Sequence, residues 1–281
     1  RDICTVFKSF CCIDWANGVI YAVGMGVPNP NFKSVAQKRY SAYQAAKVVA
    51  MRNLLQMVEE VNISSSRKVK NGMLESDEIY TQINGRLRNV IEAGHPKSEN
   101  DGSMWVTMKM HTRDIMSILL NNEQLGVQGV PARGQAAVPA PAPAPIQPST
   151  VAPPPPKSEE GVKYGGDENI IYGGLIIDAS DNRVSPALSP KIYDEAGKEV
   201  YGSADVNRDF ALRHGIVGYV KGLNEALKND RFERKPLVVK ALKTGGKSSD
   251  LVISNKDAEL LRKLEVTQTF LREARVVIAI P

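Results

Sequence analysis

The sequence predicts an α+β protein made of two small mixed modules that a proline- and alanine-rich linker joins. Hydrophobic residues make up 42% of the 281 residues and charged residues 24%, which is typical of folded chains. Short strand and helix patterns follow one another without regular strand–helix–strand alternation. Ten of the seventeen prolines fall between Pro131 and Pro156. We therefore divide the chain into an N-terminal segment (1–14), a first α+β domain (15–125), a linker (126–162) and a second α+β domain (163–281).

The linker is predicted to be extended. Proline has no backbone N–H and fixes φ, so this stretch favours polyproline II over helix or sheet. Arg133 is its only charged residue between Pro131 and Pro156. At about 3.1 Å per residue such a spacer reaches up to roughly 80 Å. The same composition also fits a ligand for an aromatic-lined groove.

In the first domain, a β-branched and aromatic strand at 18–24 leads through a proline turn into a long helix. Ser34 caps this helix, and Gln37 completes a capping box with it. One helix stripe is apolar, with small alanines first and bulky residues later, so another element can approach its first half closely. The stripe comprises Ala42, Ala46, Val49, Ala50, Leu54, Met57 and Val61. We then predict a strand at 63–69, a turn at Asn71-Gly72, a helix at 79–87, a strand at 105–110 and a helix at 113–120.

The second domain begins with a predicted strand at 170–178. A hairpin follows, with strands at 190–194 and 199–201 and its turn at Gly197. The pattern then predicts a helix from Asn207 to Lys228, strands at 237–242 and 251–253, a helix capped by Ser254 and Asp257, and a closing strand at 275–280.

Charge and apolar content exclude several classes of protein. The net charge is +5, and residues 1–130 (15 basic, 12 acidic) and 161–281 (19 basic, 17 acidic) share the excess evenly, so we predict no nucleic-acid partner. No stretch approaches the roughly 20 apolar residues of a membrane-spanning helix. The three cysteines, Cys4, Cys11 and Cys12, do not make a zinc site. We interpret them as free thiols, with a bridge to Cys4 or to another chain as the alternative.

The most specific local motif, residues 241–248, fits a relaxed phosphate-binding loop. Such a loop needs a helix that starts at Lys247-Ser248, but the pattern returns to a strand at Leu251. We therefore predict a hairpin turn at Gly245-Gly246 with a solvated Lys247, and no nucleotide site.

The other candidates also favour structural roles. His95, His111 and His214 have no metal-binding spacing, and Asp178 and Asp181 are typical of turn chemistry rather than of a cation site. Gly218 and Gly222 have GxxxG spacing on the predicted helix 207–228, where they allow close packing. Residues 231–235 mix acids with bases, which indicates a solvated loop. We predict no catalytic residue, no metal ligand and no cofactor.

Residues 15–120 resemble a bacterial outer-membrane protein family. The resemblance rests on Trp15, the strand Val19-Ile20-Tyr21-Ala22-Val23-Gly24-Met25-Gly26, and an alanine-rich helix with Ala42, Ala45-Ala46 and Ala50-Met51-Arg52-Asn53-Leu54. This family includes small envelope lipoproteins and flagellar basal-disk and H-ring assembly proteins. The second domain resembles the extension that follows this domain in some envelope proteins. The lipid-bearing cysteine of the lipoprotein members is not recognisable here.

The resemblance implies a non-enzymatic structural subunit of a bacterial cell-envelope assembly, as a ring, disc or filament, and includes association with the flagellum among its expected roles. Its partners would be further copies of itself, other envelope or flagellar-motor proteins, and peptidoglycan or the outer membrane. The expected location is the periplasm or outer membrane, after removal of a signal peptide. The alternative is a periplasmic binding module for a small ligand or cell-wall glycan.

Overall fold

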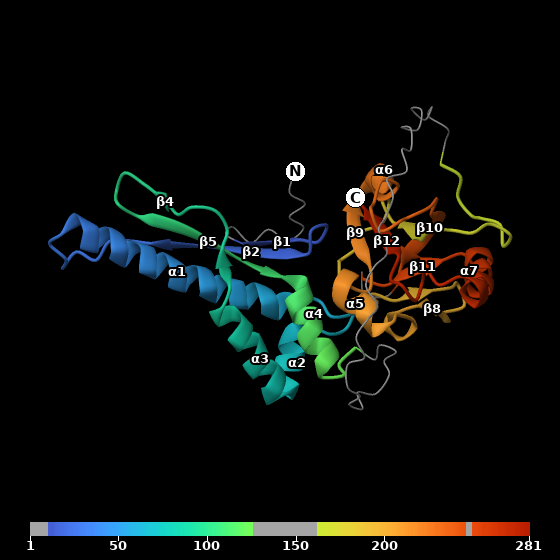
Figure 1. Cartoon of the computed structure of the whole chain (residues 1–281), viewed down its shortest axis with the longest axis horizontal. Coiled ribbons are helices and arrows are strands. Elements are labelled where there is room, and N and C mark those ends of the chain that lie inside the picture. Colours follow the sequence, from blue (N-terminus) through green and yellow to red (C-terminus); the bar gives the residue numbers. More distant parts are fainter. Residues whose placement is uncertain (1–10, 126–161, 246–248) are drawn as a thin grey trace, which may run out of the picture.

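The computed structural model describes residues 11–125, 162–245 and 249–281. They form two sheet-containing modules that mix helices and strands, which confirms the α+β prediction (Figure 1). The predicted linker lies almost wholly outside the described residues, as do Cys4 and Lys247.

An antiparallel five-stranded sheet forms the first module. Strands β2 and β5 pair over their whole length, from Val19 opposite His111 to Gly26 opposite Met104. The sheet order is β1-β2-β5-β3, and β4 also pairs with β5. The strands are β1 (Cys11–Asp14), β2 (Val19–Gly26), β3 (Ile91–Glu92), β4 (Lys97–Ser98) and β5 (Met104–His111). The sheet thus extends into the segment 1–14 through β1.

Helix α1 (Val35–Glu60) packs closely along one face of this sheet. A Cβ atom on Gly24 would overlap backbone atoms of Ala46 and Ala50, and one on Gly26 would overlap backbone atoms of Ala42 and Ala46. The predicted close approach at the alanine half of the stripe is confirmed. Ser34 precedes the helix, but its side chain makes no capping hydrogen bond, so the predicted box with Gln37 does not form.

Three shorter helices complete the first module: α2 (Val69–Glu75), α3 (Asp77–Arg88) and α4 (Thr112–Asn121). The predicted strand at 63–69 is wrong, because only the bridge between Asn62 and Lys68 forms. The predicted turn at Asn71-Gly72 is wrong as well, since both residues lie in α2. The Asn71 side chain accepts a hydrogen bond from the Lys68 N–H (2.9 Å), which starts the helix at this point.

The second module is a seven-stranded mixed sheet with the order β8-β7-β11-β10-β6-β12-β9. Its strands are β6 (Leu175–Asp178), β7 (Ile192–Tyr193), β8 (Glu199–Tyr201), β9 (Gly218–Lys221), β10 (Leu237–Thr244), β11 (Leu251–Ile253) and β12 (Val276–Ile280). Strands β10, β6, β12 and β9 run parallel. The helices are η1 (Ser203–Asp205), α5 (Arg208–His214), α6 (Gly222–Ala226) and α7 (Asn255–Thr267).

The predicted helix from Asn207 to Lys228 is wrong. Helix α5 ends at His214, and Gly215 follows with a φ of +74°, a conformation that glycine adopts without strain. The chain then enters β9 beside β12, where Tyr219 is buried. Gly218 is therefore the first residue of β9 and Gly222 the first residue after it, so the two glycines do not lie on one helix face.

Other local predictions for the second module hold. Gly197 forms the hairpin turn with a φ of +80°, and the Ser254 side chain caps α7 by accepting the Asp257 N–H (3.1 Å). The first strand is shorter than predicted and begins at Leu175, because Ile170 and Ile171 are exposed.

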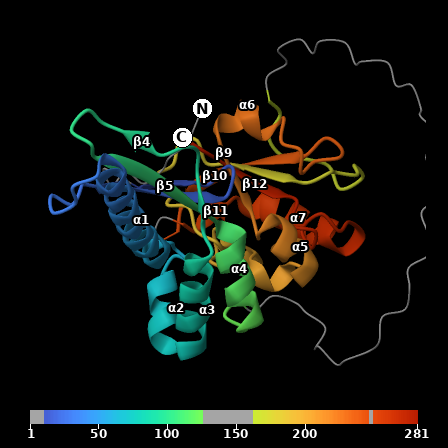
Figure 2. The same ribbon diagram turned by 60° about the vertical axis from the view of Figure 1, so that its left-hand side comes forward.

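The two modules pack directly against each other. One cluster of buried apolar side chains includes residues of both. The Leu188 N–H donates to Asn62 O (2.9 Å) and the Ser189 N–H to Ile63 O (2.8 Å). The Arg208 guanidinium donates to Leu120 O (2.9 Å) at the end of α4. Figures 1 and 2 both place α4 beside α5.

Candidate functional site

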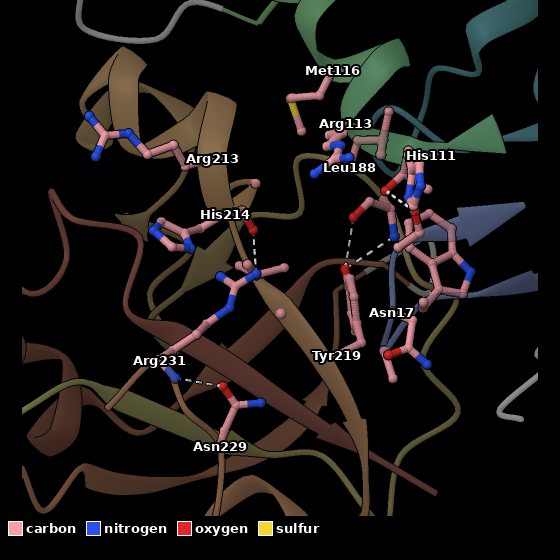
Figure 3. A pocket seen from close by; sticks show the side chains of 18 of the residues that line it. Asn17, His111, Arg113, Met116, Leu188, Arg213, His214, Tyr219, Asn229 and Arg231 are labelled. Carbon is pink, nitrogen blue, oxygen red and sulfur yellow. Dashed lines mark hydrogen bonds between the residues drawn. The ribbon is translucent and has the colours of Figure 1, made fainter. Parts of the chain in front are cut away.

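A cavity of about 350 Å³ lies where the modules meet. We call it the interface cavity; Figure 3 shows the side chains around it. The first module contributes Trp15, Asn17, Gly18, His111, Arg113 and Met116 to its lining. The second contributes Leu188, Arg213, His214, Tyr219, Asp230 and Arg231. Its walls thus come from segments far apart in the sequence.

Two aromatic side chains, one from each module, form a fixed wall of the cavity. Trp15 follows β1, and its ring meets that of Tyr219 from β9 edge to face, with centroids 5.6 Å apart. The Tyr219 hydroxyl donates to Ala187 O (3.0 Å) and accepts from the Ala187 N–H (3.1 Å). Burial raises the pKa of Tyr219, which therefore remains a neutral phenol. Both rings are held in one orientation.

Arg231 brings a half-buried positive charge to the cavity. Its guanidinium donates to Ala274 O (3.0 Å) and to His214 O, and both acceptors are neutral carbonyls. Burial lowers the pKa of Arg231, but an arginine remains protonated at neutral pH. The sequence interpretation of 231–235 as a solvated loop fits Glu233, Arg234 and Lys235, which are exposed, whereas Arg231 is half-buried and bonded to two carbonyl groups. The sequence analysis missed Arg231 because its side chain comes to lie between β9 and the segment that precedes β12 only in the folded protein.

The remaining charges of the cavity are also mainly positive. Arg113, in the first turn of α4, and Arg213, near the end of α5, line it together with one acid, Asp230. In the described part of the chain, none of the ion pairs includes Arg113, Arg213 or Arg231. Partial burial and the charges of Arg231 and Arg213 lower the pKa of His214, so its imidazole is neutral near pH 7. The cavity is therefore lined by three arginines, none of which forms an ion pair with a described carboxylate.

Trp15 also leaves a buried donor without a partner. Trp15 is only 8% exposed, and its indole Nε1 makes no hydrogen bond to any described residue. A buried N–H without an acceptor costs about 1–3 kcal/mol, so such groups are rare in native proteins. An acceptor from a bound molecule would remove this cost.

Of the three histidines, the fold brings two to this cavity. His111 ends β5 and His214 ends α5, and both are lining residues, whereas His95 lies between β3 and β4. Among the residues with described positions, no three His, Cys, Asp or Glu side chains are grouped as a metal site requires. Sequence spacing could not reveal the shared location, because 102 positions separate His111 from His214 (214 − 111 = 103, less one).

The glycine-rich motif at 241–248 lies on a hairpin. Strands β10 and β11 are antiparallel, with Thr244 opposite Leu251, and the Gly245 N–H donates to Asp250 O (2.7 Å). The antiparallel pairing that the predicted hairpin requires is present, while residues 246–248, on which the predicted turn and Lys247 fall, lie outside the described residues. Phosphate binding would need a helix after this loop, whereas the next described element after β10 is the strand β11.

Asp178 and Asp181 are engaged within the protein. Asp178 accepts hydrogen bonds from the Tyr164 hydroxyl (2.5 Å) and from Ser180, while Asp181 pairs with Lys240 (2.8 Å). Burial opposes ionisation of Asp178, but the bonds from Ser180 and Tyr164 outweigh it and lower its pKa. The bond to Asp178, with burial, raises the pKa of Tyr164 to about 12. The Asn182 N–H closes the turn onto Ala179 O (2.9 Å), as turn chemistry predicts.

A second, more open hollow of about 430 Å³ lies between the hairpins β7–β8 and β10–β11. Its acidic lining residues are already bonded: Asp194 pairs with Arg262 (2.6 Å), and Asp250 accepts the Lys191 N–H (3.0 Å). The interface cavity is the stronger candidate, because its charges lack such partners.

The cysteines differ in state. Cys12 is disulfide-bonded, which overturns the interpretation of all three as free thiols, whereas Cys11 keeps its thiol, which donates to Asn53 O (3.9 Å). None of the described helices is long and apolar enough to cross a membrane.

Comparison with known proteins gives information on the second module. No curated protein matches the chain. A family model matches the second module and indicates a two-domain bacterial protein, but it does not show the basal-disk and lipoprotein family that residues 15–120 resemble. This model describes the second domain of Treponema pallidum Tp0624; it matches residues 174–281, and the second module is similar to that domain.

Proposed function

We propose that this chain is a non-enzymatic structural subunit of a bacterial cell-envelope assembly, in which one copy docks head to tail on the next. The observation that carries the proposal is the exposed apolar end of the arm formed by α1, β2 and β5. In Figure 1 this arm extends away from the second module. We call residues 27–40 at its end the arm tip.

The arm tip exposes large apolar side chains. Val27 is 61% exposed, Val35 81% and Tyr40 64%, and Phe32 is also exposed. The loop is held in place, since the Asn29 N–H donates to Ser41 Oγ (2.9 Å) and the Phe32 N–H to Asn29 O (3.3 Å). Exposed apolar clusters mark interaction surfaces, and an ordered loop loses little entropy on binding.

The arm tip is also positively charged. No Asp or Glu occurs between positions 15 and 58, whereas the tip carries Lys33, Lys38 and Arg39. A complementary surface on the same chain is the corner between α2 and α3. There Leu74 and Tyr80 are exposed, and Asp77 and Glu78 are the acids of the first turn of α3.

The arm tip and the α2–α3 corner both expose apolar side chains, and their charges are opposite in sign. Two different surfaces of this kind suit a heterologous contact, in which the arm tip of one copy binds the corner of the next. Such a contact makes a ring if the rotation closes and a filament if it does not. The disulfide at Cys12 supports an oxidising compartment, which for a bacterial chain is the periplasm or cell surface. The flagellar association implied by the resemblance belongs to this proposal and rests on residues 15–120 alone.

The test is the assembly state of two variants, alone and mixed. Phe32→Ser/Val35→Ser removes the arm tip contact, and Leu74→Ser/Tyr80→Ser removes the corner. By sedimentation velocity, the wild type should grow in size with concentration and each variant should remain a monomer. Their mixture should form a one-to-one dimer, because each supplies the surface that the other lacks.

Val266→Ser is the control, since Val266 is 83% exposed on α7 and lies outside both surfaces. It should assemble like the wild type. A wild type that stays monomeric at high concentration, or variants that assemble normally, would refute the proposal.

A further inference from the structure

We propose that the interface cavity binds a small organic anion, with a carboxylate or phosphate head and an apolar body, that bridges the two modules. This site is separate from the arm tip and the α2–α3 corner, and it does not depend on assembly.

Charge is the first argument for an anion. Arg113 and Arg231 line the cavity from different modules; in Figure 3 Arg113 lies above Tyr219 and Arg231 to its left. Arg231 is half-buried, and its guanidinium donates to neutral carbonyl groups. A partly desolvated guanidinium gains from a closely paired anion, and bidentate binding of carboxylate or phosphate is the typical use of arginine. Asp230 alone does not balance the three guanidinium groups.

The volume of the cavity and its uncharged lining residues indicate the size and the apolar part of the ligand. Trp15, Met116, Leu188, Val217 and Tyr219 supply an apolar surface beside the cations. A cavity of about 350 Å³ is at the lower end of the range for small-molecule sites. The ligand is therefore a compact molecule that is charged at one end and apolar at the other.

The unpartnered indole N–H of Trp15 is an independent observation. Trp15 is buried beside the cavity and lacks an acceptor for Nε1 among the described residues. A carboxylate or phosphate oxygen would satisfy this donor as well as the guanidinium groups.

Because both modules line the site, occupancy should stabilise their packing. A ligand that binds only the native state raises its stability by mass action, by several degrees in Tm at about 100 times Kd. The experiment uses the full chain at constant ionic strength, with benzoate and phenyl phosphate as probes and benzyl alcohol as the neutral analogue. Kd is measured by titration calorimetry and Tm by a thermal scan.

We expect at least one anionic probe to bind and raise Tm, and benzyl alcohol not to do so. Benzoate alone would identify a carboxylate ligand and phenyl phosphate alone a phosphate ester. Arg113→Gln should weaken binding about tenfold or more, because a charge-assisted hydrogen bond is lost. Arg231→Gln should also weaken binding, but this variant loses the structural hydrogen bonds to Ala274 and His214 as well. Arg113→Gln is therefore the decisive variant, because the Arg113 side chain is exposed and its replacement should leave the fold intact.

Arg88→Gln is the matched control, because it removes the same charge from the exposed end of α3, away from the cavity. It should bind the probe like the wild type. Absence of binding by both anions at 10 mM (roughly the weak limit of specific sites), equal binding of benzyl alcohol, or equal loss in Arg88→Gln and Arg113→Gln would overturn the proposal.

Discussion

Replacing Gly24 by alanine tests whether the close contact between β2 and α1 holds the first module together. A Cβ atom at this position would lie 2.8 Å from Ala50 Cα and would overlap the Ala46 carbonyl and the Ala50 N. These are backbone atoms of a 26-residue helix, so no side-chain rotation relieves the clash. Overpacking of this kind costs about 1–3 kcal/mol. With a shift of about 2–4 °C per kcal/mol for a chain of this size, Tm should fall by roughly 2–12 °C.

The matched control is Gly85→Ala. Gly85 lies within α3, where no atom is within 4 Å of a new Cβ. Alanine favours a helix over glycine by about 0.5–1 kcal/mol, so this variant should melt above the wild type. Thermal unfolding followed by circular dichroism compares the three proteins. A Gly24→Ala protein that is as stable as the wild type would refute the argument that α1 rests directly on the glycines of β2.

Two further predictions concern the ionisation of Tyr164 and the disulfide state of Cys11 and Cys12. Because the pKa of Tyr164 is raised from 10.0 to about 12, its bond to Asp178 stabilises the fold fully below pH 10, and this contribution is lost as pH rises through about 12. Alkaline difference titration against Tyr164→Phe should show this late ionisation, and Asp178→Asn should move it back toward 10; an unshifted Tyr164 would contradict the bond. Because Cys12 is disulfide-bonded and Cys11 is not, alkylation of the denatured chain followed by peptide mass spectrometry should modify Cys11 without reductant and Cys12 only after reduction. Equal modification of both before reduction would disprove the disulfide.

Elements with a strong local pattern were predictable from the sequence. The alternating strand β5, the alanine stripe of α1, the hairpin at Gly197 and the capped helix α7 all lie where their residues place them. The long helix predicted at 207–228 failed for a definite reason. Ile216, Val220, Leu223 and Leu227 recur at helical spacing, but pairing of β9 with β12 and the turn at Gly215 override that pattern.

The sequence by itself determined the α+β class and most of the local elements. Only the tertiary structure decided that the modules share a buried cluster, and that Trp15, Arg113, Tyr219 and Arg231 surround one cavity. The physical reason is the range of the forces involved. Helix periodicity, capping and turn preferences act over a few residues, whereas the cavity depends on β9 pairing with β12 and on packing between segments about 200 positions apart, such as those of Trp15 and Arg231 (231 − 15 = 216).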